Sequence, residues 1–490
     1  MKTSQSADIA PKFCTGSTMR HVLIMTSTAS VGLMSVFLVD FLNLFYISML
    51  GMKQLAAAVG YAGTILFFLT SIAIGIMIAT TAIVSRAIGR GDRAKARLLA
   101  GSSVVIMFTS MALISAMFFP FIESAIALVG AEGETLQIAK GFLQIVVPSV
   151  PILGISLVLA GILRAAGDAK RAMYATLGTG VFTAFLDPLL IFGFDLGVTG
   201  AAISTALSRL GSIGIALYSV IKIHDMLAFP PLRIIIKDVH PCMIIAIPAI
   251  LANISTPVAN AYVTSSIAQF GDGAVSGWAF IGRLIPLAFG LIFALSGAIG
   301  PIIGQNYGAV QYDRVRQTVI DSLVVTVAYT AIIWLFLFIT KGYITTAFHL
   351  DPEATELVIF FINIVIVTFL FNGALFVANA TFNNLGYATY STVLNWGKAT
   401  IGTIPFVWAG AHYYGAKGAI LGQGIGYVVF GVAGVFLCYR VINAIAASQG
   451  QVQKELDPTI VVPNIPEFSS GKCAGICVHS EVQDMKPKVA

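Results

Sequence analysis

Charged side chains are scarce in this sequence. Of 490 residues, 28 are Lys or Arg and 22 are Asp or Glu, together only 10%, whereas 57% are hydrophobic. Soluble domains carry about 25% charged residues, so a water-soluble fold could not bury all the apolar side chains of this chain. The mean hydropathy of +0.90 instead indicates a membrane protein.

Motifs for catalysis, nucleotide binding and disulfide formation are also lacking. The five cysteines are scattered and predict no disulfide framework, and the six histidines form no pair with metal-ligand spacing. No HExxH, nucleophile elbow or P-loop occurs. These absences argue against a membrane enzyme and an ATP-driven pump, and nothing resembles a nucleic-acid-binding module. We expect no cofactor.

Twelve apolar stretches are long enough to cross a bilayer. A spanning helix needs about 20 apolar residues, and only helices or closed barrels satisfy their backbone polar groups in lipid. The sequence therefore predicts an all-α membrane protein of twelve transmembrane helices. Their predicted bounds are 22–50, 55–85, 98–129, 137–162, 172–194, 200–221, 243–269, 275–303, 318–340, 355–382, 391–411 and 418–439.

Basic residues concentrate in alternate loops, which predicts the orientation. Cytoplasmic loops of membrane proteins are enriched in Lys and Arg. With the N-terminus in the cytoplasm, the outer loops hold only Lys53, Lys341 and Lys417. The sequence thus predicts an inner-membrane protein with both termini cytoplasmic. The inner loops would hold Arg86, Arg90, Arg93, Lys95, Arg97, Arg164, Lys170, Arg171, Lys222, Arg233, Lys237, Arg314 and Arg316.

The two halves of the sequence repeat each other. GRGDRAKAR at 89–97 corresponds to GQNYGAVQYDRVR at 304–316, and RAAGDAKRAMYATL at 164–177 to NNLGYATYSTVL at 383–394, with offsets of about 218 residues. Six helices in each half give a parallel repeat, and two similar halves around a cavity suit a transporter. The predicted divisions are a cytoplasmic N-terminal segment at 1–21, an N-lobe at 22–221, a cytoplasmic linker at 222–242, a C-lobe at 243–440 and a disordered cytoplasmic tail at 441–490.

Two acidic residues lie deep inside predicted spans. Asp40 is about nineteen residues into the first span and Asp187 about fifteen into the fifth, counted from the cytoplasm. At about 1.5 Å per residue, both fall in the outer half of the membrane, where they can meet. A charged carboxylate in hydrocarbon costs several kcal/mol, and burial favours its protonated form. Such an acid can exchange a proton for a cation, as a coupled antiporter requires.

Polar residues and prolines near these acids could assist them. Asn43 and Tyr46 follow Asp40 on roughly one helix face and could supply hydrogen bonds; a role in joining helices fits equally well. Pro188 removes one backbone hydrogen bond and crowds the carbonyl of Ala184. We predict hinges at this proline and, in the seventh span, at two more, namely Pro248 and Pro257.

Three basic residues inside spans have no acid nearby in the sequence. Arg283 lies in the eighth span and could face the cavity or the interface between the lobes. There it would repel cationic compounds unless it were paired or matched by an anionic part of the substrate. For Arg209 and Lys398 we expect the charged ends to reach the membrane surface by snorkelling.

Four stretches resemble the multidrug and toxic compound extrusion (MATE) family, in particular its DinF-like prokaryotic branch. They are FLVDFLN at 37–43, LRAAGDAKRAM at 163–173, LDPLLIFGFDLGVTGAAIST at 186–205 and IIGQNYGAVQYDRVRQ at 302–317. The resemblance runs in order from about residue 20 to 440. It implies a V-shaped pair of six-helix lobes that expels cationic or amphipathic compounds in exchange for H⁺ or Na⁺.

For single residues, the resemblance implies a coupling site in the N-lobe. Asp40 would accept the proton, and Asp187 would influence or share it, so that the pair would titrate as a unit. Thr183 and Thr205 match polar positions of this site. Many relatives have Asn at position 183, and Ala160 also replaces an Asn, so the hydrogen-bond network around the acids is thinner here.

The C-lobe lacks the acids that some members of the family use for Na⁺. The seventh span, IPAILANISTPVANAYV, has no acid, and the tenth has Glu356 only at its outer end. We therefore expect coupling through the N-lobe and favour H⁺, because an acid pair with few other ligands suits a proton better than a metal ion. Na⁺ at Asp40 and Asp187 is the alternative.

The main alternative function is that of a flippase for lipids or lipid-linked oligosaccharides from the same superfamily. Such proteins usually have more basic residues in the cavity and often extra helices, so twelve spans and LDPLLI with Asp187 favour an exporter. A channel fits poorly with acids in one half only. The expected partners are the lipid bilayer and small organic substrates, with no nucleic acid, and we expect a monomer.

Overall fold

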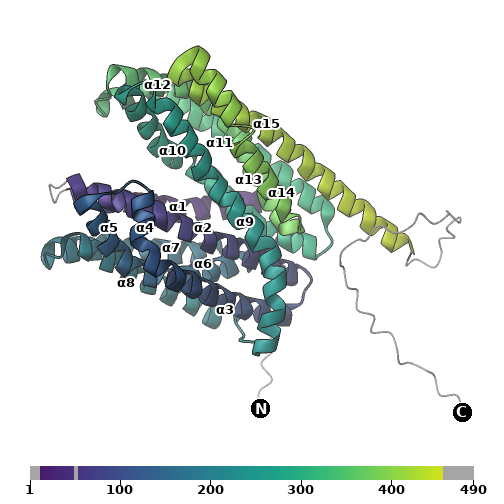
Figure 1. The fold of residues 1–490 in the computed structure, drawn as a ribbon. Helices are drawn as coiled ribbons and strands as arrows, with labels where there is room; N and C mark the ends of the chain where they lie inside the picture. The colour runs from purple at the N-terminus through teal and green to yellow at the C-terminus, as the bar shows by residue number, and fades with distance from the viewer. Residues whose placement is uncertain (1–10, 49–52, 456–490) are drawn as a thin grey trace, which may run out of the picture. The chain divides into compact units, whose positions relative to one another are not determined.

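The structure is a computed structural model that describes residues 11–48 and 53–455, except for the side chains of residues 40, 41, 44, 45, 47, 48, 53, 54, 56 and 449–455. Every regular element in this part of the chain is helical (Figure 1). The first half contains α1 (Thr18–Ser48), α2 (Lys53–Gly89), α3 (Arg93–Phe118), α4 (Ile122–Leu128), α5 (Gly133–Val146), α6 (Val150–Ala165), α7 (Ala169–Pro188) and α8 (Gly197–Tyr218). The second contains α9 (Leu232–Ala268), α10 (Asp272–Gly308), α11 (Tyr312–Ala347), α12 (Pro352–Asn363), α13 (Phe369–Leu385), α14 (Ala388–Ala399) and α15 (Ile404–Glu455).

Eleven helical stretches in the described residues are long and apolar enough to cross a membrane. The last, at 388–448, covers the two spans that the sequence predicts at 391–411 and 418–439. Gly415 separates them, because its φ of 63° and ψ of −149° are not helical and interrupt α15. The fold is therefore the predicted all-α membrane fold, and each half has an apolar core of its own.

The turn before α7 and the turn before α14 occupy equivalent places in the two repeats. Gly167 and Gly386 both adopt left-handed conformations, with φ of 81° and 92°, which glycine tolerates best. Asp168 then caps α7 by accepting a hydrogen bond from the backbone N–H of Arg171 at 3.1 Å. In the second half, Tyr387 follows the glycine, and no side-chain cap forms.

Prolines shape several helices. Pro188 ends α7 and is followed by a π-helical turn, Leu189–Gly193. Pro248 and Pro257 lie inside α9, which continues through both, and the carbonyl of Pro248 accepts a hydrogen bond from Thr392 at 2.8 Å. In α10 the backbone departs from helical geometry at Phe289, one turn after Pro286.

Helix α9 begins inside the segment that the sequence predicts as the linker between the lobes. Residues 232–242 are helical and form the first turns of α9, with Pro241 inside the helix. Only residues 224–231 lie between the π-helical turn after α8 and the start of α9. The helix packs against α2 and α3 of the first half and against α14 of the second (Figure 1).

The two lobes meet through a contact that follows the internal repeat. A Cβ atom added to Gly89, at the end of α2, would lie 2.0 Å from the backbone oxygen of Gln305. One added to Gly308, at the end of α10, would lie 2.2 Å from that of Arg86. Since Gly89 corresponds to Gly308 and Arg86 to Gln305, the contact is nearly two-fold symmetric, as in an isologous interface.

Side chains of the same two helices reinforce this contact. Arg86 donates hydrogen bonds to the carbonyls of Asn384, at 2.7 Å, and Asn383, at 3.0 Å, in the last turn of α13. Gln305 donates to the carbonyl of Ala165, at 2.8 Å, at the end of α6. Each lobe thus supplies donors to carbonyls at a helix C-terminus of the other, where backbone acceptors lack helical partners.

An N-terminal strap, residues 11–17, lies across the same end of both lobes. Lys12 donates a hydrogen bond to the carbonyl of Gly167, at 2.8 Å, and the backbone N–H of Phe13 donates to Gln305, at 3.0 Å. Arg314 of α11 donates to the carbonyls of Phe13 and Gly16. The Phe13 side chain is 1% exposed, so the strap is part of the packed structure.

Candidate functional site

Asp187 is completely buried in the last turn of α7. The side-chain amide of Asn43, from α1, donates a hydrogen bond to its Oδ2 at 3.1 Å. The hydroxyl of Ser204, from α8, lies near the carboxyl group, but it too is buried and has no hydrogen-bond partner among the described residues. Oδ1 has no hydrogen-bond partner among the residues that the structure describes. A buried carboxyl oxygen without a partner is rare in folded proteins, and inside a membrane it marks a candidate site.

The chain after Asp187 explains how α8 comes so close. Pro188 cannot continue the α-helical hydrogen-bond pattern, and the π-helical turn that follows leads into α8. A Cβ added to Gly200 would lie 2.6 Å from the carbonyl oxygen of Leu190. Glycine at this position therefore lets the first turn of α8 pack against the π-helical turn. Ser204, one turn later, then lies beside the acid.

The other predicted acid, Asp40, belongs to α1, three residues before Asn43. Its side chain lies outside the described residues, so the pairing of Asp40 with Asp187 stays a prediction. The bond between Asn43 and Asp187 does bring the C-terminal part of α1 against the end of α7. This agrees with the expected depth of the acids.

The remaining residues predicted for this site have different surroundings. Thr183 is 5% exposed and donates to the carbonyl of Thr179, one turn earlier in α7. Thr205 likewise donates within its own helix, to Ala201. The ring of Tyr46 packs edge-on against Phe192, with centroids 6.3 Å apart.

In the described part of α8, the side chain that lies near the Asp187 carboxyl is that of Ser204 rather than the predicted Thr205, whose hydroxyl is bound to Ala201. Sequence reasoning missed this serine because adjacent residues on a helix point in directions about 100° apart. The π-helical turn also shifts the phase between α7 and α8, and this irregularity could not be read from the spacing.

The expectation of snorkelling is wrong for both Arg209 and Lys398, which are 7% and 3% exposed. Arg209 donates to the hydroxyl of Ser149 at 2.6 Å and to the carbonyl of Val146 at 3.3 Å. Lys398 donates to the side-chain oxygen of Asn372 at 3.0 Å. Both cations find local acceptors and need not reach the membrane surface. Arg283, in contrast, is exposed on α10.

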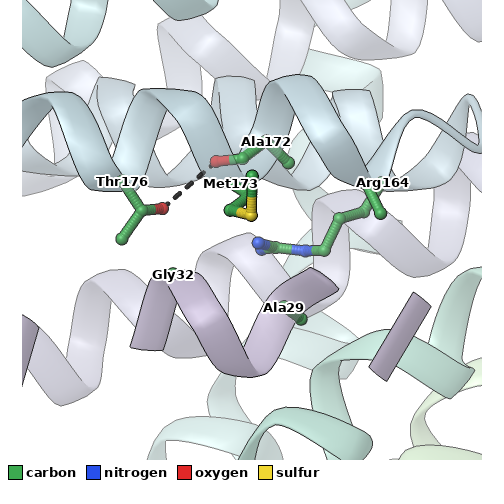
Figure 2. Close-up of a pocket in the computed structure, with 7 residues that line it drawn as sticks. Ala29, Gly32, Arg164, Ala172, Met173 and Thr176 are labelled. Carbon is green, nitrogen blue, oxygen red and sulfur yellow. Dashed lines mark hydrogen bonds between the residues drawn. The ribbon is translucent and has the colours of Figure 1, made fainter. Parts of the chain in front are cut away.

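Arg164 points into a small pocket of the N-lobe, between α1, α6 and α7 (Figure 2). One of its terminal nitrogens lies 2.7 Å from the sulfur of Met77 in α2. Its Nε is buried and has no hydrogen-bond partner among the described residues. The sequence placed this arginine at a loop boundary, where its charge would be solvated. The pocket is also lined by Ala29, Gly32, Ala169, Ala172, Met173 and Thr176.

Asp168 lies four residues after Arg164 but binds other partners. Its carboxyl group pairs with the guanidinium of Arg171, and Nε2 of His224 lies 2.7 Å from Oδ2. Burial alone would raise the pKa of Asp168, but the hydrogen bonds from His224 and Arg171 outweigh it and hold this pKa well below its usual range. The network joins the turn before α7 to the segment after α8.

Known proteins resemble this chain over most of its length. A family model described as MatE matches two ranges of equal length, residues 29–189 and 248–408, one in each half. This match confirms the predicted internal repeat. The FAD transporter of Shewanella oneidensis is 28% identical over 440 residues, which cover 88% of this chain and 96% of that protein. The multidrug export protein MepA of Staphylococcus haemolyticus is 24% identical over 420 residues, 84% and 91% of the two chains.

Solved structures resemble the fold. The Vibrio cholerae MATE transporter VcmN in the bent form has a TM-score of 0.82 and 25% identity, over 87% of this chain and 97% of that one. A MOP superfamily transporter from Pyrococcus furiosus has the same TM-score with 21% identity, over 91% and 99% of the two chains. The second likeness concerns the fold alone.

Proposed function

Because this chain belongs to the MatE family of membrane transporters, as its two matching ranges show, we propose that it exports amphipathic organic compounds in exchange for an inward-moving cation. The coupling site is in the N-lobe, at Asp187 and Asp40. The observation that carries this proposal is the complete burial of Asp187 with one carboxyl oxygen unpartnered among the described residues. A proton and a cationic group of the substrate would bind to this carboxyl group in turn.

The coupling ion in this proposal is H⁺, with Na⁺ as the alternative. A metal ion that prefers oxygen ligands is usually bound by several of them. Near the Asp187 carboxyl the structure records one amide, from Asn43, and one hydroxyl, from Ser204. The amide of Asn43 donates its N–H and so does not act as a cation ligand in this arrangement. A proton needs only the carboxyl group, which favours it.

Alternating access would then follow from the charge of the acids. Protonation neutralises the site and lowers the cost of keeping it in a closed, apolar surrounding. Release of the proton on the other side restores the charge and with it the affinity for a cationic group. Pro188, Pro248 and Pro257 are the proposed hinges of this movement. The protein would act as a monomer in the inner membrane, with both termini in the cytoplasm.

An anionic amphiphile is a second candidate for the substrate. The Shewanella relative is described as a FAD transporter, and FAD carries a diphosphate. Arg164 is a cation within the helices of the N-lobe, and it has no ion-pair partner in the described part of the chain. Such an interior favours a negatively charged ligand more than a cationic drug.

Transport in proteoliposomes tests the proposal. A pH gradient would be imposed without Na⁺, and the movement of ethidium would be followed for wild type, Asp40→Asn and Asp187→Asn. We expect gradient-driven movement by wild type and its loss in both variants. Movement that appears only with a Na⁺ gradient would overturn the choice of H⁺. If neither gradient moved ethidium or a flavin nucleotide, the function as an exporter would be contradicted and a flippase favoured.

A further inference from the structure

Arg164 brings a positive charge into the N-lobe without a carboxylate to neutralise it. A guanidinium has five N–H donors and no acceptor. Its recorded hydrogen bond is to the thioether of Met77, a weak acceptor, and its Nε lacks a partner among the described residues. Asp168 is close in sequence but is engaged by Arg171 and His224. The side chain as a whole is half-buried, and a partly desolvated cation with so few acceptors is stabilised by an anion that joins it.

Two fully buried cations of the protein differ from Arg164 in this respect. Arg209 has a hydroxyl and a carbonyl as acceptors. Lys398 has the amide oxygen of Asn372 and also lies 5.5 Å from the ring centroid of Tyr427. In the second repeat, the position of Arg164 is held by Asn383, a neutral residue that accepts a hydrogen bond from Ser391 at 3.2 Å. The unsatisfied charge therefore has no equivalent at this position of the C-lobe.

The pocket around the guanidinium is the size of a chemical group rather than of a drug. Its cavity volume is about 40 Å³, far below the roughly 300–1,000 Å³ of typical ligand sites. Ala29, Gly32 and Ala172 leave this space, and larger residues would fill it. Figure 2 shows the guanidinium lying between α1 and α7, directed toward Gly32 and Met173. No acidic residue is among those that line the pocket.

We propose that this pocket binds one anionic group, a phosphate or carboxylate, of an amphiphilic molecule, with Arg164 as the ligand-binding residue. The planar guanidinium matches the two oxygens of such a group. The inference rests on the proposed function only for the view that the molecule is transported. Thr176, in the wall of the pocket, precedes Asp187 by eleven residues of α7, or about 17 Å along the helix. The pocket can therefore hold an anion while the acid exchanges its cation.

Riboflavin and FMN are matched probes, because they differ by a single phosphate. Their binding to the full-length protein would be measured by flavin fluorescence in nanodiscs of phosphatidylcholine, in a Tris chloride buffer free of phosphate and carboxylate anions. For wild type we expect FMN to bind at least tenfold more tightly than riboflavin. Arg164→Gln should remove this preference and leave riboflavin binding unchanged. Arg164→Lys should retain part of it, since an ammonium offers charge without the two parallel donors.

Arg209→Gln is the control for loss of a buried arginine, and it should keep the preference for FMN. Equal binding of both flavins to wild type, or an unchanged preference in Arg164→Gln, would overturn the proposal. If neither flavin binds, inorganic phosphate is the probe: it should raise the melting temperature of wild type more than that of Arg164→Gln, and an equal effect would again overturn it.

Nanodiscs that contain phosphatidylglycerol distinguish two sources of the anionic group. If this lipid weakens FMN binding to wild type but not to Arg164→Gln, the pocket takes a lipid headgroup. If phosphatidylglycerol does not change FMN binding, the pocket binds the anionic group of a soluble molecule and not a lipid headgroup. Gradient-driven ethidium transport is measured separately, so failure of the anion pocket and failure of the exporter function give different results.

Discussion

At one pair of equivalent positions in the repeat, the N-lobe has Arg164 and the C-lobe has the neutral Asn383. At another, the region of Asp187 corresponds to Ile404–Phe406, which has no ionisable side chain. At the contact between the lobes, in contrast, Gly89 and Gly308 play matching parts, as do Arg86 and Gln305. The halves are thus alike where they touch and different inside. The difference teaches that a symmetric contact can join two lobes of different interior chemistry: Asp187 and Arg164, which have buried polar atoms without a hydrogen-bond partner among the described residues, both lie in the N-lobe.

The largest expected effect comes from removing the acid that only the N-lobe has. Asp187→Asn should lower gradient-driven ethidium transport in proteoliposomes by at least tenfold, because an amide cannot take up and release the coupling proton. Glu356→Gln is the matched control in the C-lobe, where the acid is exposed and paired with Lys417. It should stay within about twofold of wild type. Equal losses in the two variants would remove the distinction between the lobes.

A second pair of variants compares the satisfied cation with the unsatisfied one. Asn372→Leu leaves Lys398 buried without its acceptor and should destabilise the protein by about 2–3 kcal/mol. The double variant Asn372→Leu/Lys398→Met should regain most of the lost stability, because the buried charge is removed as well. Arg164→Met should cost little, since few hydrogen bonds are lost. Denaturant unfolding in mixed micelles measures all four proteins, and a large loss in Arg164→Met would show that this arginine is satisfied in the folded state.

A third experiment tests the symmetry of the contact between the lobes. Gly89→Ala and Gly308→Ala would each place a methyl group against backbone of the opposite lobe, so both should loosen this end of the molecule. Cys14 in the strap reports on it, because burial raises the pKa of its thiol and slows its reaction with maleimide. With the other four cysteines replaced by serine, both variants should label several-fold faster. An effect at one glycine only would mean that the contact is not symmetric.

The smallest expected effect concerns Asp168 and its counterpart Tyr387. Since the folded-state pKa of Asp168 lies below that of the unfolded chain, its ionised form stabilises the protein above about pH 5 and this contribution is lost as the pH falls through the folded pKa. Asp168→Asn should therefore melt a few degrees lower at pH 7, with a smaller difference near pH 4. Tyr387→Phe should show no such dependence. A constant difference between pH 4 and 7 would contradict the assigned network.

Much of the fold could be predicted because long apolar stretches and repeated loop motifs depend on sequence alone. Apolar length predicts the helical class, and the loop motifs predict the repeat. Helical rise predicts that the C-terminal part of α1 approaches Asp187. The start of α9 was harder to predict, because residues 232–242 mix charged and apolar side chains and Pro241 is typical of a helix end. Helices in proteins are stabilised by packing more than by propensity, and α9 packs on both lobes.

The details of the site depended on contacts between distant segments. Ser204 lies beside Asp187 only because of a π-helical turn and a close approach at Gly200. The burial of Arg209 and Lys398 depends on acceptors 60 and 26 residues away in the sequence. The sequence predicts Arg164 in a cytoplasmic loop, because it is next to a turn. The sequence does not show that its side chain points into the N-lobe. Spacing rules describe one helix at a time, and these features involve several.

The strap sets a length. Lys12 is bound to the turn of the N-lobe before α7, and Thr18 donates a hydrogen bond to Asp321 of α11. The backbone from Lys12 to Thr18 makes six Cα–Cα steps, which can stretch to about 20 Å at most. While both hydrogen bonds hold, the strap limits how far the lobes can separate at this end, and a wider separation requires that one of these bonds break. A short segment before the first membrane-spanning helix thus limits the separation of the two halves.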